Sequence, residues 1–429
     1  MVAGPPNWAR YMPTPAAAPP PPPPLWAAAS ADATKLRRSS IVNSYEFVGP
    51  TPRRHQQRTS WNHWQLRDVV LCPSARPELY SIYRCNVDKY DISKQQSTRV
   101  LHDLEFDPVS VAVGGDFVVV GGQRAELAVA RLGDPAATTT VVRSGGSINN
   151  FVTLDRVPPP GPRRRRLQRD SAVFADDGVT SLNITSERDA PRLLVCNNDH
   201  TVRLMSLPDL GLVTELTFPT AVNYAAVSPD GARMCVVGDT NEVFLFNKRG
   251  DAFEKIAVLT ASNDASFSCD WSQSSELFAV GSQDGCVTVW DVRSREKLAQ
   301  LETCQHGRSR GACRNVKFSP SGSVDLLAFS EHTSFVSIVD ARSFDKRQAL
   351  RVDPGPRDGA SSGIGAAAAA DLVDLLTPDS PALSGYDMQI TGLRFSPDSS
   401  ALFVGLEESI LEYTVDRIGR HSFSSLELI

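Results

Sequence analysis

The chain has 429 residues, of which 41% are hydrophobic, and it carries a formal net charge of −5. This composition supports a large folded core, and the negative charge balance argues against a general nucleic-acid-binding protein, because such proteins are usually basic. The sequence contains no apolar run that approaches the roughly 18 residues of a membrane-spanning helix, so none is expected.

The first 60 residues or so are predicted to form a disordered, extended tail. Proline and alanine dominate this segment, and residues 19–24 are an uninterrupted proline run. Such a composition favours polyproline II conformation over a packed core. Two interpretations stay open for the run: a ligand for SH3-, WW- or profilin-like modules, or a plain spacer.

Two repeated units are predicted between residues 66 and 132. The first contains "DVVLC", "ELYSIYRCNVDKYDI" and "TRVLHDL", and the second is "VSVAVGGDFVVVGGQRAELAVARL". Short β-branched and aromatic runs separated by polar turns are typical of antiparallel strands. The preceding stretch "WNHWQLRDVV", residues 61–70, is a candidate to close a ring of such units by pairing with C-terminal strands, since closure removes exposed sheet edges.

The pattern is clearest from Leu193 onward, after a predicted insertion at about 156–170. Five units each contain an apolar run, a polar turn and a second apolar run, which ends near residues 205, 246, 290, 339 and 413. In "FAVGSQDGCVTVWDV", residues 278–292, Asp284-Gly285 predicts a tight hairpin between strands 277–282 and 286–291. Repeats of roughly 40–45 residues with about four strands each are the signature of propeller blades. A second insertion, at about 353–385, explains the long last interval.

The units together predict an all-β fold, a β-propeller of about seven blades over residues 61–429. Ser-Pro turns at 228–229, 319–320 and 396–397 mark the same position in three blades. The pattern resembles the WD-repeat family. The resemblance makes four residues structural parts of one blade, namely Trp271, Ser282, Trp290 and Asp291. The chain departs from the family in having a single true Trp-Asp pair and almost no Gly-His signal, so the consensus hydrogen-bond network of a blade is incomplete.

No set of residues with the spacing of a catalytic site is evident. The seven histidines are dispersed, and the sequence has no H-E-x-x-H, Gly-x-Ser-x-Gly or phosphate-loop motif. The eight cysteines include no Cys-x-x-Cys pair, which indicates reduced, buried thiols rather than disulfides or a zinc site. We therefore expect no enzyme activity, no cofactor and no metal, and instead a binding scaffold.

Acidic residues recur in the turns between the second and third predicted strands of the blades. We single out Asp199, Asp239, Asp284, Glu331 with its neighbour His332, and Glu407 as candidate partner-binding residues. Because these turns converge on one face of a propeller, the acids would form a rim that attracts a cationic segment or a free α-amino group. The alternative is that each acid only makes hydrogen bonds within its own turn.

A closer resemblance is carried by "CRNVKFSPSGSVDLLAFSEHTSFVSIVDARS", residues 313–343. This stretch is similar to the signature of a mainly fungal WD-repeat family that includes a substrate receptor of the GID (CTLH-type) ubiquitin ligase. The resemblance implies protein partners: ligase subunits, and substrates recognised by a free N-terminus. The competing interpretation is a structural hub or adaptor in another complex, in signalling, trafficking or chromatin. The reduced cysteines indicate a cytoplasmic or nuclear protein, or one found in both compartments. We expect no membrane binding, and the acidic charge balance makes nucleic acid an unexpected partner.

Overall fold

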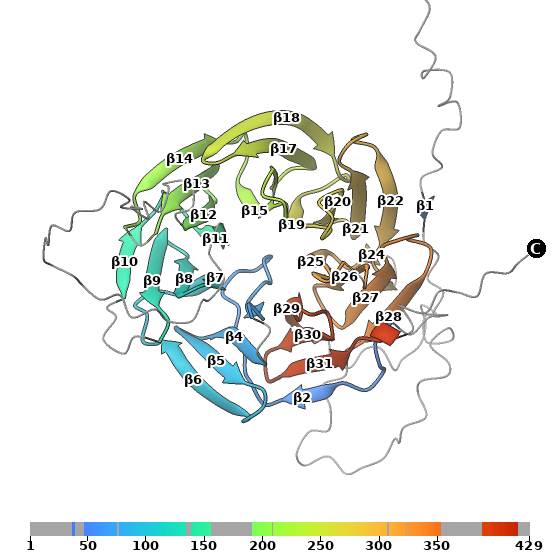
Figure 1. The fold of residues 1–429 in the computed structure, drawn as a ribbon, viewed down its shortest axis with the longest axis horizontal. Helices are drawn as coiled ribbons and strands as arrows, with labels where there is room; N and C mark the ends of the chain where they lie inside the picture. The colour runs from blue at the N-terminus through green and yellow to red at the C-terminus, as the bar shows by residue number, and fades with distance from the viewer. Residues whose placement is uncertain are drawn as a thin grey trace, which may run out of the picture. The chain divides into compact units, whose positions relative to one another are not determined.

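The computed structural model of the chain describes residues 37–38, 47–74, 77–133, 139–155, 191–207, 209–306, 309–322, 324–352 and 388–418. All of them belong to one compact unit, residues 36–429. They form a ring of seven four-stranded antiparallel sheets, the blades of a WD-repeat-like β-propeller (Figure 1). The predicted fold class is confirmed.

We number the blades in chain order. Blade 1 contains β3 (Val70–Leu71), β4 (Glu78–Tyr83), β5 (Asn86–Asp91) and β6 (Gln96–Leu101). Blade 2 contains β7 (Pro108–Gly114), β8 (Phe117–Gly122), β9 (Glu126–Arg131) and β10 (Thr140–Arg143). Blade 3 contains β11 (Asn149–Asp155), β12 (Arg192–Asn197), β13 (Thr201–Ser206) and β14 (Leu212–Thr217). Blades 4 and 5 contain β15 (Val222–Val227), β16 (Arg233–Gly238), β17 (Glu242–Arg249), β18 (Ala252–Thr260); and β19 (Ser266–Trp271), β20 (Leu277–Ser282), β21 (Cys286–Asp291), β22 (Lys297–Glu302). Blades 6 and 7 contain β25 (Cys313–Phe318), β26 (Leu326–Glu331), β27 (Phe335–Asp340), β28 (Arg347–Arg351); and β29 (Ile390–Phe395), β30 (Ala401–Leu406), β31 (Ile410–Thr414) with β2 (Arg53–His55).

Two further elements lie outside this four-strand plan. The short strand β1 (Arg37–Arg38) pairs in parallel with β22 and adds a fifth strand to blade 5. A small hairpin, β23 (Gln305–His306) with β24 (Ser309–Arg310), precedes blade 6. Helix is limited, among the described residues, to Arg417 and Ile418, and the structure describes no helix that is long and apolar enough to cross a membrane.

The hairpin predicted around Asp284-Gly285 forms with the expected bounds, as β20 and β21. Gly285 has φ of 80°, a conformation that glycine adopts without steric cost. The Asp284 carboxylate accepts a hydrogen bond from the backbone N–H of Cys286 at 3.0 Å. Local sequence therefore determines this turn, as the Asp-Gly signal predicted.

The ring closes at a different segment from the one expected. β2 pairs antiparallel with β31 as the outermost strand of blade 7, with Arg53 opposite Glu412 and His55 opposite Ile410. Gln348 of blade 6 accepts hydrogen bonds from the backbone N–H groups of Phe47 and Val48, at 2.7 and 2.9 Å. The propeller thus begins near residue 47 rather than 61, and the expectation that residues 61–70 close the ring was wrong.

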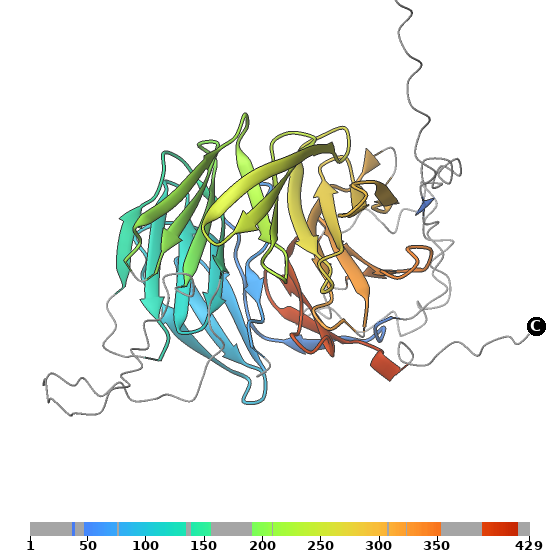
Figure 2. The same ribbon diagram turned by 45° about the horizontal axis from the view of Figure 1, so that its top comes forward.

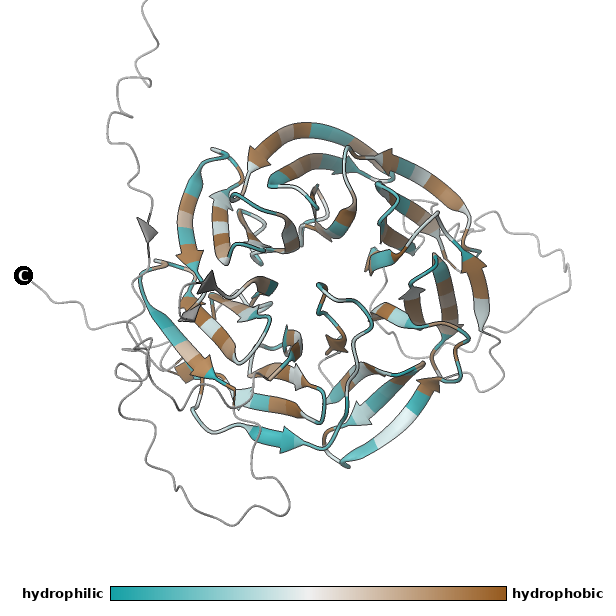
Figure 3. Cartoon of the chain, turned by 180° about the vertical axis from the view of Figure 1, so that it is seen from behind, coloured by the Kyte–Doolittle hydropathy of each residue, from teal (hydrophilic) through white to brown (hydrophobic). Residues whose placement is uncertain are grey.

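The core is distributed between the blades. The larger clusters of buried apolar side chains are shared by neighbouring blades, for example one that joins blades 3, 4 and 5. Figure 2 shows the twisted blades side by side, and Figure 3 shows hydrophobic segments along strands throughout the ring. Since each blade packs on two others, closing the ring buries both faces of every sheet. The predicted insertions at 156–170 and 353–385, and the tail up to residue 36, lie outside the described residues.

Candidate functional site

The turns between the second and third strands of the blades all lie on one face of the ring, which we call the upper face. The antiparallel order within each blade places these turns opposite the turns that follow the first strands. The structure brings the six predicted site residues to this face, in or directly beside the turns of blades 3 to 7. Their surroundings differ widely.

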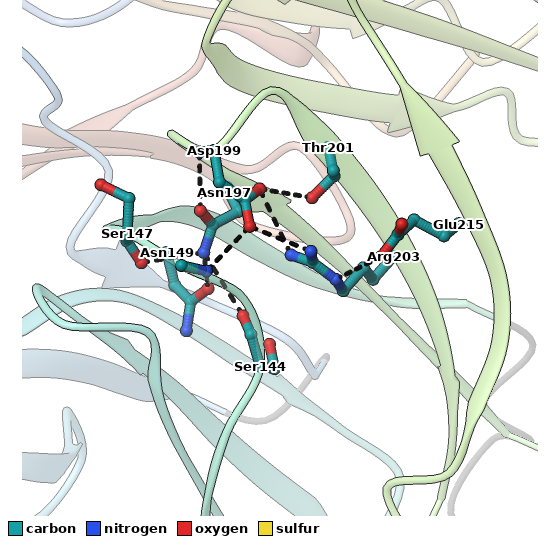
Figure 4. A network of polar contacts seen from close by, with 9 residues as sticks. Ser144, Ser147, Asn149, Asn197, Asp199, Thr201, Arg203 and Glu215 are labelled. Atoms are coloured by element: carbon teal, nitrogen blue, oxygen red, sulfur yellow. Dashed lines mark hydrogen bonds and ion pairs between the residues drawn. The ribbon is translucent and has the colours of Figure 1, made fainter.

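Asp199 is part of a polar network that neutralises its charge (Figure 4). Its carboxylate forms an ion pair with Arg203 at 2.9 Å and accepts hydrogen bonds from the Thr201 hydroxyl at 2.6 Å and the Gly146 N–H at 2.8 Å. Burial raises the pKa of Asp199, but the bonds from Arg203, Thr201 and Gly146 outweigh it and leave the pKa below its ordinary value. Arg203 also pairs with Glu215 at 2.8 Å, so this turn is tied to the outer strands of its own blade.

Glu331 and Asp284 also have local structural contacts. Glu331 is the last residue of β26 and only 1% exposed, and its carboxylate accepts a 2.7 Å hydrogen bond from the Cys304 N–H. Asp284 accepts hydrogen bonds from the N–H groups of Cys286 and Asn263, both at 3.0 Å. His332 is half-buried, and its backbone N–H donates to the Ala312 carbonyl at 3.0 Å. A carboxylate buried as deeply as that of Glu331 does not face a partner.

Asp239 and Glu407 are the exposed acids of the set. Asp239 accepts a hydrogen bond from the Asn223 side-chain amide at 2.8 Å, and Glu407 accepts one from the Trp61 indole N–H at 3.3 Å. The neighbouring Glu408 pairs with Arg58 at 2.8 Å. The continuous acidic rim predicted from the sequence is therefore reduced to two exposed carboxylates on blades 4 and 7.

The upper half of the central channel is filled by residues 61–68, which we call the channel segment. Figure 1 shows the chain crossing the middle of the ring on its way from β2 to β4. Asn62 donates to the Pro108 carbonyl of blade 2 at 2.8 Å, and Asn315 of blade 6 donates to the Arg67 carbonyl. Val69, directly after the segment, donates to the Thr391 carbonyl of blade 7 at 3.1 Å. The segment is thus bound to blades around the channel.

A buried ionic cluster anchors the lower end of the channel segment. Lys317 of β25 donates to the Asp68 carboxylate at 2.7 Å and to the Tyr224 hydroxyl at 2.6 Å, and Tyr224 donates to Asp68 at 2.9 Å. Burial raises the pKa of Asp68, but the charges of Lys317 and Arg394 and the two hydrogen bonds outweigh it and lower the pKa overall. Burial lowers the pKa of Lys317.

At its upper end, the channel segment is folded on itself. The Arg67 guanidinium donates to the carbonyls of His63, Trp64 and Leu66 and lies over the Trp61 ring, 3.6 Å from its centroid. The His63 Nδ1 accepts hydrogen bonds from the N–H groups of Gln65 and Leu66, at 3.2 and 3.0 Å. Burial, together with the nearby charges of Arg67 and Arg314, lowers the pKa of His63 to about 4. In this internally hydrogen-bonded loop, Trp64 is 72% exposed.

The predicted structural residues all lie in blade 5. Trp290 is 1% exposed and stacks on Phe278, with ring centroids 5.0 Å apart. Trp271 donates its indole N–H to the Ala226 carbonyl of blade 4 at 2.9 Å. The Ser282 hydroxyl donates to the Ala265 carbonyl at 2.9 Å, and Asp291 accepts from the N–H groups of Arg293 and Ser294. These contacts join strands and turns within the blade and to its neighbour.

Sequence reasoning singled out residues 61–70 as a ring-closing segment and missed their place in the channel, although the two tryptophans within "WNHWQ" carried a signal. A tryptophan in such a polar run does not belong to the apolar face of a strand. A role outside the hydrophobic core would have explained its presence. No group of three or more His, Cys, Asp or Glu side chains in the described part of the chain is arranged to hold a metal ion.

The chain matches two family models over part of its length. Residues 311–351, which include blade 6, match an uncharacterised protein domain (DUF2415). Residues 187–317 match the N-terminal domain of the nucleolar protein 10-like family, a β-propeller. Each match covers less than half of the chain.

Three curated proteins illustrate the range of similarity. The uncharacterized protein C4G3.03 of Schizosaccharomyces pombe is 26% identical over 386 residues, which cover 88% of this chain and 95% of that protein. The uncharacterized protein YLR149C of Saccharomyces cerevisiae is 26% identical over 37% of this chain and 27% of its own length. Eukaryotic translation initiation factor 3 subunit I of Emericella nidulans is 27% identical over 32% of this chain and 43% of its own length.

Proposed function

We propose that this propeller is a protein-interaction scaffold whose upper face binds a partner segment around Trp64. The observation that carries the proposal is the 72% exposure of Trp64 at the mouth of the channel. Tryptophan is enriched among the residues that dominate binding energy at protein interfaces. An exposed indole on a loop that is already fixed costs little entropy to bury, so the site is pre-organised for binding.

The matched variants Trp64→Ala and Leu212→Ala test this proposal. Both residues are exposed apolar side chains, but Leu212 lies on β14, the outer edge strand of blade 3. In affinity purification with quantitative mass spectrometry, Trp64→Ala should lose the partners that wild-type protein retains, and Leu212→Ala should keep them. An interface tryptophan that contributes about 2 kcal/mol corresponds to roughly 30-fold in affinity. Retention of every partner by Trp64→Ala would contradict the proposal.

The finer form of the proposal is that the chain is a substrate receptor of a GID (CTLH-type) ubiquitin ligase. Its support is the resemblance carried by residues 313–343, which form most of blade 6, and the two exposed acids beside the channel mouth. A free α-ammonium group would pair with Asp239 or Glu407 and lose that pairing when acetylated. No catalysis by this chain is involved, since a receptor only positions its substrate.

Charge reversal distinguishes this receptor model from general scaffolding. Asp239→Lys with Glu407→Lys should abolish capture of substrates with a free N-terminus, and acetylating the substrate should have the same effect. Glu254→Lys, at an exposed acid on β18, is the control and should change nothing. Ligase subunits should co-purify with the wild-type protein, the double variant and the Glu254→Lys control. We expect this complex in the cytoplasm, the nucleus or both. If ligase subunits were absent from every purification, the receptor model would be refuted, and the proposal that Trp64 binds a partner would be unaffected.

The second candidate function is that of a structural subunit in another multiprotein complex. The similarity to eukaryotic translation initiation factor 3 subunit I favours it, because that relative is by name one subunit of a larger factor. A structural subunit should co-purify with its partners at constant stoichiometry. A ligase receptor should instead accumulate substoichiometric partners when the proteasome is inhibited, and this difference separates the two candidates.

A further inference from the structure

The lower half of the central channel contains a cavity of about 220 Å³ that the channel segment does not fill. Its walls come from the inner strands of blades 1, 2 and 3 and from one side chain on the inner strand of blade 7, which neighbours blade 1. The lining residues that matter here are Leu71, Val111, Val113, Phe151, Leu154 and Arg394. The cavity opens toward the face opposite the channel segment, because these residues lie in the later halves of their strands.

Arg394 is the one cationic side chain in this lining. It comes from β29, an inner strand, and within the described part of the chain its guanidinium makes no hydrogen bond or ion pair. Its Nε is fully buried and has no acceptor there. A guanidinium without an acceptor costs free energy, so an acceptor in the cavity that reaches its other N–H groups would be bound favourably.

The charged groups near Arg394 are Asp68, Asp270 and Lys317, and within the described part of the chain none of them forms a hydrogen bond with it. Asp68 is paired with Lys317 and Tyr224, as described above. Asp270 accepts a 2.7 Å hydrogen bond from the Phe318 N–H, and burial raises its pKa. Burial lowers the pKa of Arg394 itself, but attraction to Asp68, Tyr224 and Asp270 outweighs it, so the guanidinium stays charged.

We propose that this cavity binds a small organic carboxylate, with its carboxylate group on Arg394 and its apolar body against Val111, Val113 and Leu154. A guanidinium is suited to a carboxylate because it offers two parallel N–H donors. An apolar cavity of about 150 Å³ accommodates benzene, so 220 Å³ accommodates a body of that size with its carboxylate. The single positive charge of the guanidinium matches one negative charge better than the two of a phosphate monoester. The site is separate from the upper face and does not depend on the proposed scaffold function.

The test uses benzoate and hexanoate as probes and their neutral amides, benzamide and hexanamide, as matched controls. In isothermal titration calorimetry with the full chain, at least one carboxylate should bind saturably and its amide should bind at least about tenfold more weakly, since hydrogen bonds to a charged group contribute about 1.5–3 kcal/mol. Failure of both carboxylates to bind, or equal binding of acid and amide, would overturn the proposal.

Two variants place the binding in the cavity. Arg394→Gln removes the charge and should weaken carboxylate binding about 10- to 100-fold. Val113→Phe leaves the charge and fills the cavity, and it should weaken binding comparably by exclusion. Circular dichroism and thermal melting report whether each variant is folded. If Arg394→Gln does not fold, the binding result for Val113→Phe decides the test. Carboxylate binding that survives in folded Val113→Phe lies elsewhere on the protein and would refute the site.

Discussion

The ion pair between Asp68 and Lys317 supports a prediction that joins the channel segment to the stability of the whole ring. The Lys317 side chain is 3% exposed, and its Nζ lies 2.7 Å from the Asp68 carboxylate. Asp68→Asn keeps the shape but removes the negative charge. It should therefore destabilise the fold by about 3–5 kcal/mol, the usual cost of leaving one member of a buried pair uncompensated.

Proton release by Lys317 sets an upper limit to this cost. Neutralising a lysine with the ordinary pKa of 10.5 at pH 7 costs about 5 kcal/mol, at about 1.4 kcal/mol per pKa unit. In Asp68→Asn, the pKa of Lys317 falls further below 10.5, so the unfolded state binds more protons than the folded state between these two values. The variant should accordingly gain stability relative to wild type as the pH rises from 7 to about 9.

Urea denaturation followed by intrinsic fluorescence measures these effects. Asp103→Asn, which removes an exposed acid beside His102, is the control and should change stability by less than about 0.5 kcal/mol. The double variant Asp68→Asn with Lys317→Met should recover most of the loss, because replacing both members of a buried pair is often close to neutral. A loss below about 1 kcal/mol in Asp68→Asn, or no recovery in the double variant, would refute the argument.

Two further predictions concern His63 and Trp290. Because the pKa of His63 is lowered from 6.5 to about 4, its contribution to stability is present above pH 6.5 and is lost progressively down to about pH 4, by about 3 kcal/mol in all. His63→Asn keeps an acceptor for the two backbone N–H groups. Denaturation at several pH values should show that this variant loses less unfolding free energy between pH 6.5 and about 4 than the wild type does. Equal losses would contradict the assignment of this pH dependence to His63. Trp290→Ala should lower the free energy of unfolding by about 3–5 kcal/mol, because the ring is fully packed on Phe278. The free energy of unfolding of Trp64→Ala should stay within about 0.5 kcal/mol of the wild-type value. Similar losses of stability in Trp290→Ala and Trp64→Ala would show that burial of the tryptophan does not determine the loss.

Much of the fold could be predicted because its signals are local. The strands over 277–282 and 286–291 and the turn between them follow from Asp284-Gly285 and the apolar runs on either side. The repetition of this pattern predicts a propeller, since a single hairpin cannot bury its faces alone. The burial of Trp290 follows in the same way from its place in a strand.

The role of each acid in the upper turns was beyond such reasoning. Asp199 and Asp239 occupy equivalent turns, yet one is paired with Arg203 and the other is exposed. Arg203 lies only four positions after Asp199, in the next strand, and this spacing does not show whether the two side chains meet. The periodic pattern predicts the turn but not the side chain that the acid contacts.

The blades, their turns and their apolar faces follow from local sequence, because hairpins and alternation act over a few residues. How the ring closes and what fills its channel depend on contacts between distant parts of the chain. Lys317 and Asp68 are 249 positions apart, and Arg54 and Ser409 are 355 apart, so no local pattern relates them. Ring closure brings the first and last parts of the chain together, and it is this step that places Asp68 beside Lys317 and Arg394 beside the cavity.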